Sequence, residues 1–162
     1  MISPNSNTAT VDLAIPMRAE YVSIARLTAA GVANRVGFDI DAIEDIKVSL
    51  SEVCNRIINM QGKYAGGHDA GCKIEFVISS GSLCINFYVN NMEPMSNFVP
   101  DAGGDAYGQP GINIDLDKLA GDRPEDGDYE DQLQLSLITI LMDEFIVNPS
   151  ENCLVSMKKY VD

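Results

Sequence analysis

Two side chains of opposite charge stand four residues apart in the segment IKVSLSEVCNRIINM, residues 46–60. The segment has a helical pattern, so Glu52 and Arg56 share one helix face. The pair is either the remnant of an active site or an ordinary ion pair. A guanidinium has no lone pair with which to ligate a metal ion. We therefore predict an exposed ion pair, worth about 0.2–0.5 kcal/mol.

The cysteines and the histidine offer no second constellation of reactive groups. Cys54, Cys72, Cys84 and Cys153 lack CxxC spacing and have no histidine nearby in the sequence. This pattern favours buried free thiols over a metal site or a disulfide framework. His68 lies in the glycine-rich stretch AGGHDAG, and we expect it to be an exposed loop residue. We expect no metal ion.

Length and charge exclude several classes of function. The chain has 162 residues, the size of one domain, with a formal charge of −13 from 24 acidic and 11 basic residues. Such an acidic chain is a poor ligand for nucleic acid, which is bound through Lys and Arg. No apolar run approaches the roughly 20 residues of a membrane span, and the start of the chain lacks a signal-peptide pattern. We expect a cytoplasmic protein.

The first half of the chain predicts a strand followed by two helices. Residues 10–16 alternate as a strand does, and residues 18–38 have helical period with Gly37 at its end. Asp41 and Glu44 are spaced as a capping box for a second helix that runs to about Met60. The inner face of the first helix is predicted to hold Tyr21, Ile24, Ala25, Thr28, Val32 and Val36.

The second half predicts two hairpins and one more helix. Residues 72–79 and 83–90 form the first hairpin, around a Ser-Gly turn. Residues 131–145 are apolar almost all round and predict a buried helix, and residues 143–148 and 153–161 form the last hairpin. A long acidic loop is predicted between the first hairpin and this helix, because residues 91–131 carry 11 acids against 2 bases. The order indicates an α+β two-layer sandwich with one mixed sheet and helices on one face.

At this point the sequence resembles a known family. Residues 20–58, EYVSIARLTAAGVANRVGFDIDAIEDIKVSLSEVCNRII, are similar to the first two helices of the anti-sigma factor serine kinases of the sigma-B and sigma-F type. LMDEFIV resembles their segment after the last helix. The family belongs to the GHKL ATPase superfamily with gyrase, histidine kinases and MutL. The resemblance implies a single Bergerat-fold domain over residues 1–162, with residues 92–130 equivalent to the lid.

The resemblance also assigns chemistry to the second helix. In the family this helix carries Glu-x-x-x-Asn, where the acid orients an attacking hydroxyl and the Asn ligates the Mg²⁺ of ATP. Glu52 matches the acid, but Arg56 stands at the Asn position. Glu52 is then vestigial as a catalytic residue. Asn55, one residue early, could approach the site only in a shifted register, which the sequence leaves open.

Two further nucleotide motifs of the family are altered. The Asp of Asp-x-Gly falls on Asn91 or Asn90, and Glu93 follows where the Gly should admit the base. In the glycine-rich turn that holds phosphates, Asp131, Gln132 and Gln134 replace glycines. The acidic lid is equally unfavourable to an anion such as ATP.

The resemblance thus implies a pseudokinase that has kept the fold. We expect an anti-sigma-factor-like regulator in transcription and stress response, which binds a sigma factor or an anti-anti-sigma protein through Arg26 of the first helix. No cofactor is expected. The alternative is an active ATP-dependent serine/threonine kinase with divergent motifs, for which Mg-ATP is the cofactor. A homodimer stays open.

Overall fold

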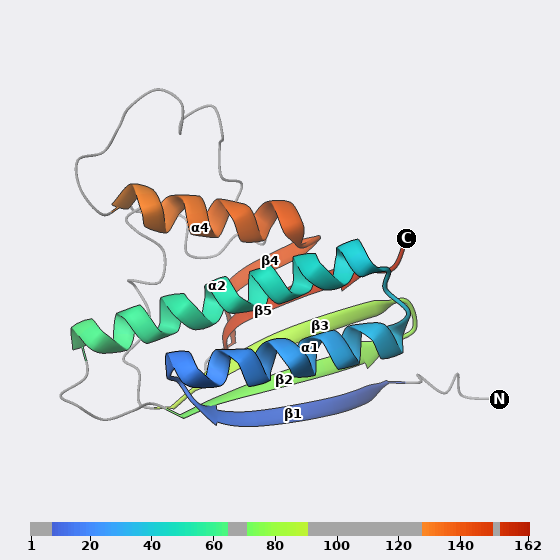
Figure 1. Cartoon of the computed structure of the whole chain (residues 1–162), viewed down its shortest axis with the longest axis horizontal. Helices are drawn as coiled ribbons and strands as arrows, with labels where there is room; N and C mark the ends of the chain where they lie inside the picture. Colours follow the sequence, from blue (N-terminus) through green and yellow to red (C-terminus); the bar gives the residue numbers. More distant parts are fainter. Residues whose placement is uncertain (1–7, 65–70, 91–127, 151–152) are drawn as a thin grey trace.

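The chain folds into one sheet with helices on one of its faces (Figure 1). The computed structural model describes residues 8–64, 71–90, 128–150 and 153–162; side chains within 61–64, 128–132 and 148–150 are outside the described part. The elements in chain order are β1 (Ala9–Pro16), η1 (Ala19–Tyr21), α1 (Val22–Val36), α2 (Ile40–Tyr64), β2 (Gly71–Ser79), β3 (Ser82–Val89), α4 (Asp128–Leu141), β4 (Glu144–Ser150) and β5 (Cys153–Tyr160). The α+β two-layer architecture predicted from the sequence is confirmed.

The sheet is antiparallel between all the described strands, so the prediction of a mixed sheet is wrong. Its order is β1-β2-β3-β5-β4. The reason is the connection between β1 and β2: the chain reverses from β1 to α1, from α1 to α2 and from α2 to β2, and three reversals leave β2 antiparallel to β1 (Figure 1). A two-residue turn joins β2 to β3, with Gly81 at a φ of 74° that favours glycine.

The ends of the first two helices are set by local chemistry. Gly37 ends α1 in the left-handed conformation, with a φ of 102°, as predicted. The capping box predicted at Asp41 and Glu44 is wrong. Asp39 caps α2 instead, because its Oδ1 accepts the N–H of Ala42 at 2.8 Å while its own carbonyl begins the helix.

The core lies between the sheet and the helices. Alternate residues of the central strands are fully buried on the helix side, among them Ile74, Phe76, Ile85 and Phe87. The helices cover them with an apolar face that includes Ile46, Leu50, Val53 and Ile57 of α2 and Ala25, Ala29 and Ala33 of α1. Small alanines on α1 allow its backbone to lie close to its neighbours.

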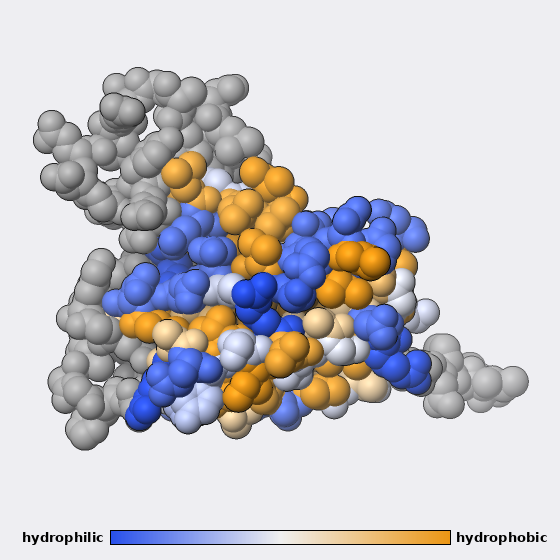
Figure 2. All heavy atoms as spheres, viewed as in Figure 1, coloured by the Kyte–Doolittle hydropathy of each residue, from blue (hydrophilic) through white to orange (hydrophobic). Residues whose placement is uncertain are grey.

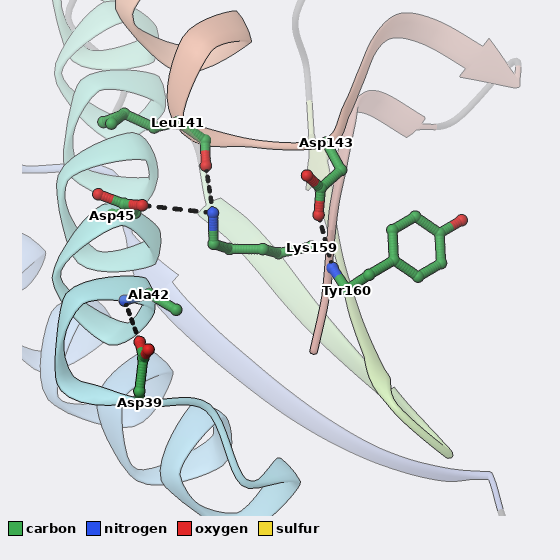
Figure 3. A network of polar contacts seen from close by, with 7 residues as sticks. All are labelled: Asp39, Ala42, Asp45, Leu141, Asp143, Lys159 and Tyr160. Atoms are coloured by element: carbon green, nitrogen blue, oxygen red, sulfur yellow. Dashed lines mark hydrogen bonds and ion pairs between the residues drawn. The ribbon is translucent and has the colours of Figure 1, made fainter. Parts of the chain in front are cut away.

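One lysine of β5 joins three elements at the edge of this core. Lys159 Nζ lies 3.3 Å from Oδ2 of Asp45 on α2 and donates to the carbonyl of Leu141, the last residue of α4, at 2.6 Å (Figure 3). The carbonyl of Leu141 lies at a helix end, where no intrahelical donor is available. Lys159 therefore caps α4 while it holds α2 against β5.

The prediction that α4 is buried holds for one face only. Leu135, Ile138 and Met142 pack into the core with at most 4 % of each residue exposed. Leu133, Leu137 and Ile140 lie on the outer face and are exposed. Nothing in the described ranges forms a helix long and apolar enough to cross a membrane.

Candidate functional site

The helix α2 holds Glu52 and Arg56 one turn apart, as predicted, but the prediction that the pair is exposed is wrong. Only 4 % of Arg56 is exposed, and Glu52 is half-buried. Arg56 is buried because Val53, Ile57 and their neighbours on the same side of α2 are in the core. An i, i+4 pattern predicts that two residues share a face but does not tell whether another layer covers that face.

A buried guanidinium needs oppositely charged or hydrogen-bonding groups around it. Moving a charge out of water costs several kcal/mol, which has to be offset by paired groups. Arg56 is engaged in an interaction in the structure. A fixed cation therefore stands on α2 at the position where the resembling family has its metal ligand, and it carries no lone pair for a metal.

The segment aligned with the glycine-rich turn lies within a helix. Helix α4 begins at Asp128, so residues 130–135 have helical backbone. In a helix that begins there, only the N–H groups of the first turn lack an intrahelical partner. The N–H groups of Gln132 and Gln134 lie beyond that turn, so they are used within the helix and are not free to hold a phosphate.

Among the described residues, two buried polar side-chain atoms near these positions lack hydrogen-bond partners. They are Oγ of Ser49 on α2, a residue with 0 % exposure, and Oε1 of Gln134 on α4. The two helices pack against each other. Gln134 therefore places a buried amide where the resembling family has a glycine that lets the backbone approach its ligand.

The remaining predicted site residues are not brought together by the described part of the chain. Asn55 is exposed on α2, and the shifted register left open by the sequence stays a prediction. Asn91 and Glu93 lie outside the described residues. Asp131 belongs to α4, but its side chain, like that of Gln132, is outside the described part.

The residues that are described do not fit a magnesium nucleotide. A buried cation stands at the position that the resemblance aligns with the metal ligand, and the N–H groups of Gln132 and Gln134 in α4 already have helical acceptors. Both departures remove a group that binds the phosphates or their metal ion. We derive no chemical step through ATP for this chain.

A second candidate site lies on α1, around Arg26. Arg26 is exposed, and it is followed by Leu27, which is 73 % exposed. Ile24 is also exposed at 44 %, so its predicted place on the inner face is wrong. Sequence reasoning missed Leu27. Leu27 could have been found in the sequence as an apolar residue outside the set of positions predicted for the inner face of this helix.

The four cysteines have free thiols, and Cys54, Cys72 and Cys153 are buried, as predicted for them. Cys84 is half-buried instead, because it lies on the face of the sheet that the helices leave open. Burial raises the pKa of Cys54, and it raises the pKa of Cys72 to about 12. A thiol held protonated in this way is a weak nucleophile, so these cysteines are structural.

Comparisons with known proteins agree on one family. Residues 15–159 match the family described as the histidine kinase-like ATPase domain. The chain is similar to the serine-protein kinase RsbW of Bacillus cereus, of Bacillus anthracis and of Bacillus thuringiensis. Each is 37 % identical over 158 residues, which cover 93 % of this chain and 84 % of the relative.

Proposed function

The chain belongs to the histidine kinase-like ATPase family, in its anti-sigma factor kinase branch, and from that membership we propose that it is a regulator that works by binding. Its partner is a sigma factor or an anti-anti-sigma protein, and it binds this partner without hydrolysing ATP. The likeness to serine-protein kinase RsbW supports the anti-sigma role in general. The residues at the nucleotide positions support the absence of hydrolysis.

The burial of Arg56 carries this proposal. A charged side chain with 4 % exposure is held by its surroundings and cannot swing away to admit a metal ion without leaving an uncompensated charge inside the protein. Loss of a surface ligand alone would leave room for water to complete the metal's coordination. A fixed positive charge at the same place leaves no such route.

The nucleotide part of the proposal is tested by calorimetric titration with Mg-ATP. We expect no saturable heat at physiological concentrations, while serine-protein kinase RsbW of Bacillus cereus serves as the positive control. A thermal-shift series with the same ligand is the second readout, since a ligand that binds the native state raises the melting temperature. Micromolar binding would reject the proposal.

The partner part of the proposal places the contact on α1. Arg26 and Leu27 are both exposed, and arginine is one of the residues in which the hot spots of protein interfaces are enriched. The partner is identified by co-purification from the native cell. Arg26→Ala should then weaken its binding at least about tenfold. Arg35→Ala is the matched control, because nine residues along a helix place Arg35 on the opposite side from Arg26.

The second candidate function is a serine/threonine kinase with divergent motifs. Glu52 favours it, since this residue matches the acid of the family motif and is half-buried on α2, one turn from Arg56. With the partner in hand, transfer of labelled phosphate from ATP tests the alternative directly. Phosphorylation that Glu52→Ala abolishes would establish the kinase, and unchanged partner binding by the same variant without ATP would support the binding protein.

A further inference from the structure

One side of α2 carries a row of polar residues, none of which is fully exposed. The residues follow one another at spacings of four, three and four, so they share one side of the helix. Ser49 and Arg56 have 0 % and 4 % exposure, and the other two are half-buried. We call this set the polar row of α2: Asp45, Ser49, Glu52 and Arg56.

Helix α4 lies along the polar row. Lys159 contacts Asp45 of α2 and the carbonyl of Leu141 of α4, and the two helices run in opposite directions (Figure 1). Counted from this contact, Glu52 is seven residues along α2, and Gln134 is seven residues back along α4 on the side of Leu141. At a rise of about 1.5 Å per residue both lie about 10 Å from the contact, so Gln134 is level with the middle of the row.

The packing of α4 along this row leaves polar atoms without partners. Among the described residues, Oγ of Ser49 and Oε1 of Gln134 are buried and form no hydrogen bond. The opposite side of α4 is apolar and exposed at Leu133, Leu137 and Ile140, and Figure 2 shows apolar side chains gathered where Figure 1 draws α4. A surface helix usually turns its polar side to water. The polar side of α4 is therefore poorly matched to α2.

The end of α4 at Leu141 is held in place by several contacts. Lys159 caps the helix there. Just past this end, the N–H of Asp143 donates to the carbonyl of Lys158 at 3.0 Å, and Oδ2 of Asp143 accepts the N–H of Tyr160 at 2.7 Å. This end of α4 is thus joined to β5 and, through Lys159, to α2.

The first half of α4 can separate from α2 at a reduced cost. Opening exposes Leu135, whose burial favours the closed form. It also lets water reach Oγ of Ser49 and Oε1 of Gln134, and hydration removes the desolvation penalty of a buried polar atom that has no partner. Segments whose closed packing is weak in this way open locally while the rest of a domain stays folded.

We propose that α4 is a flap hinged at Leu141, whose first half opens away from the polar row of α2. The count from the Lys159 contact places Arg56 level with residue 130, in the first turn of α4, so the opening uncovers Arg56. The closed form buries this cation, and the open form presents it to an anionic group in solution. The inference concerns the packing of α4 and does not depend on the proposed regulatory partner.

The test follows the modification of arginine by phenylglyoxal at neutral pH, read by mass spectrometry. Arg26 is exposed and should react rapidly, whereas Arg56 reacts only in the open form. The double variant Ser49→Ala and Gln134→Leu removes both atoms that lack partners, so it favours the closed form. We expect it to slow the modification of Arg56 at least about fivefold and to leave that of Arg26 unchanged.

The matched control is Ser51→Ala. Ser51 stands on the same helix, but its Oγ donates to the carbonyl of Lys47 at 2.7 Å, so the variant raises helix propensity equally without removing an atom that lacks a partner. It should change the rate at Arg56 by less than about twofold.

Low urea concentrations separate opening of the flap from unfolding of the whole domain. Local opening exposes little surface, so the rate at Arg56 should stay nearly constant below the unfolding transition. Cys54 is buried in the core, and its labelling by a maleimide should rise steeply over the same range because it requires global unfolding.

Three results would overturn the proposal. A rate at Arg56 that rises with urea in step with that at Cys54 would show that only global unfolding exposes the arginine. Equal rates at Arg56 in the wild type and the double variant would show that the two polar atoms do not control the opening. Absence of modification of Arg56 over a period in which Cys54 reacts also rejects it. If the double variant does not fold, Ser49→Ala alone must still slow the reaction at Arg56 relative to Ser51→Ala.

Discussion

Lys159 of β5 and Asp45 of α2 form an ion pair of 3.3 Å between Nζ and Oδ2, with 14 % of the lysine side chain and 37 % of the aspartate side chain exposed. The same ammonium donates to the carbonyl of Leu141 (Figure 3). One charge therefore serves both an ion pair and a helix end. The contact fixes α2, which carries Glu52 and Arg56, relative to the end of α4.

The first prediction concerns this contact. Lys159→Met keeps the aliphatic length and removes the charge, so the carbonyl and the aspartate both lose their partner. We expect the free energy of unfolding to fall by about 1–3 kcal/mol, measured by urea denaturation. Lys47→Met is the control, since Lys47 pairs with an exposed Glu44 three residues away, and such pairs contribute about 0.2–0.5 kcal/mol. Equal losses in the two variants would contradict the special role of Lys159.

The second prediction separates the observed cap of α2 from the one that the sequence suggested. Asp39→Ala removes the acceptor of the Ala42 N–H and should lower the free energy of unfolding by about 0.5–2 kcal/mol. Asp41→Ala should change it by less than about 0.5 kcal/mol, because Asp41 lies on the exposed side of the first turn. Thermal melting of the two variants in parallel decides between them, and the reverse order would restore the capping box.

The cap shows what could be predicted from the sequence and what could not. Strands, helices and hairpins follow from short-range periodicity, so their order was predicted correctly, as was Gly37. Asp39 and Asp41 both have the chemistry of a cap, and the true helix start lies within the usual error of one or two residues. The direction of β1 relative to β2 depended on the two helices between them, which periodicity does not encode.

Burial was predicted less well, because it depends on the neighbouring layer. Arg56 and Ile24 show errors in opposite directions: the charged residue is buried and the apolar residue is exposed. Helix α4 is apolar on both sides, so its sequence could not tell which side faces the core. The nucleotide-motif residues Asn91 and Glu93 lie outside the described residues, and their predicted roles stay predictions.

The third prediction concerns pH. Partial burial, together with a hydrogen bond to Glu75 and the charge of that residue, raises the pKa of Tyr88 to about 12 from an ordinary value of 10.0. The folded protein thus holds the phenol proton more tightly than the unfolded chain does. The resulting stability is complete below about pH 10 and is lost as the pH rises toward about 12.

Urea denaturation at a series of pH values measures this loss. Tyr88→Phe removes the titrating group, so its free energy of unfolding should fall less steeply between about pH 10 and pH 12 than that of the wild type. Tyr160→Phe is a control for general alkaline effects, because Tyr160 is an exposed tyrosine at the end of β5. Parallel curves for the wild type and Tyr88→Phe would show that Tyr88 does not carry the effect.

The fourth prediction ranks the thiols by access. A maleimide at neutral pH should label Cys84 well before Cys54, Cys72 and Cys153, since Cys84 is half-buried and the others are buried. Mass spectrometry of a time course identifies the order. In urea all four should react at similar rates, because unfolding removes the difference in exposure. Early labelling of Cys54 in the native state would contradict its position in the core.

The last prediction returns to Arg56. Arg56→Asn restores the residue type of the resembling family, yet it should not restore nucleotide binding, since the N–H groups of Gln132 and Gln134 stay in the helical bonds of α4. It should instead lower the free energy of unfolding by about 2–4 kcal/mol, because it removes a buried charged group and leaves the partner of that group unpaired. Arg26→Ala, which changes an exposed arginine, should cost less than about 0.5 kcal/mol. Melting temperatures of the three proteins with and without Mg-ATP give both readouts. A stable Arg56→Asn variant whose melting temperature rises with Mg-ATP would mean that this one arginine had been blocking an otherwise working site.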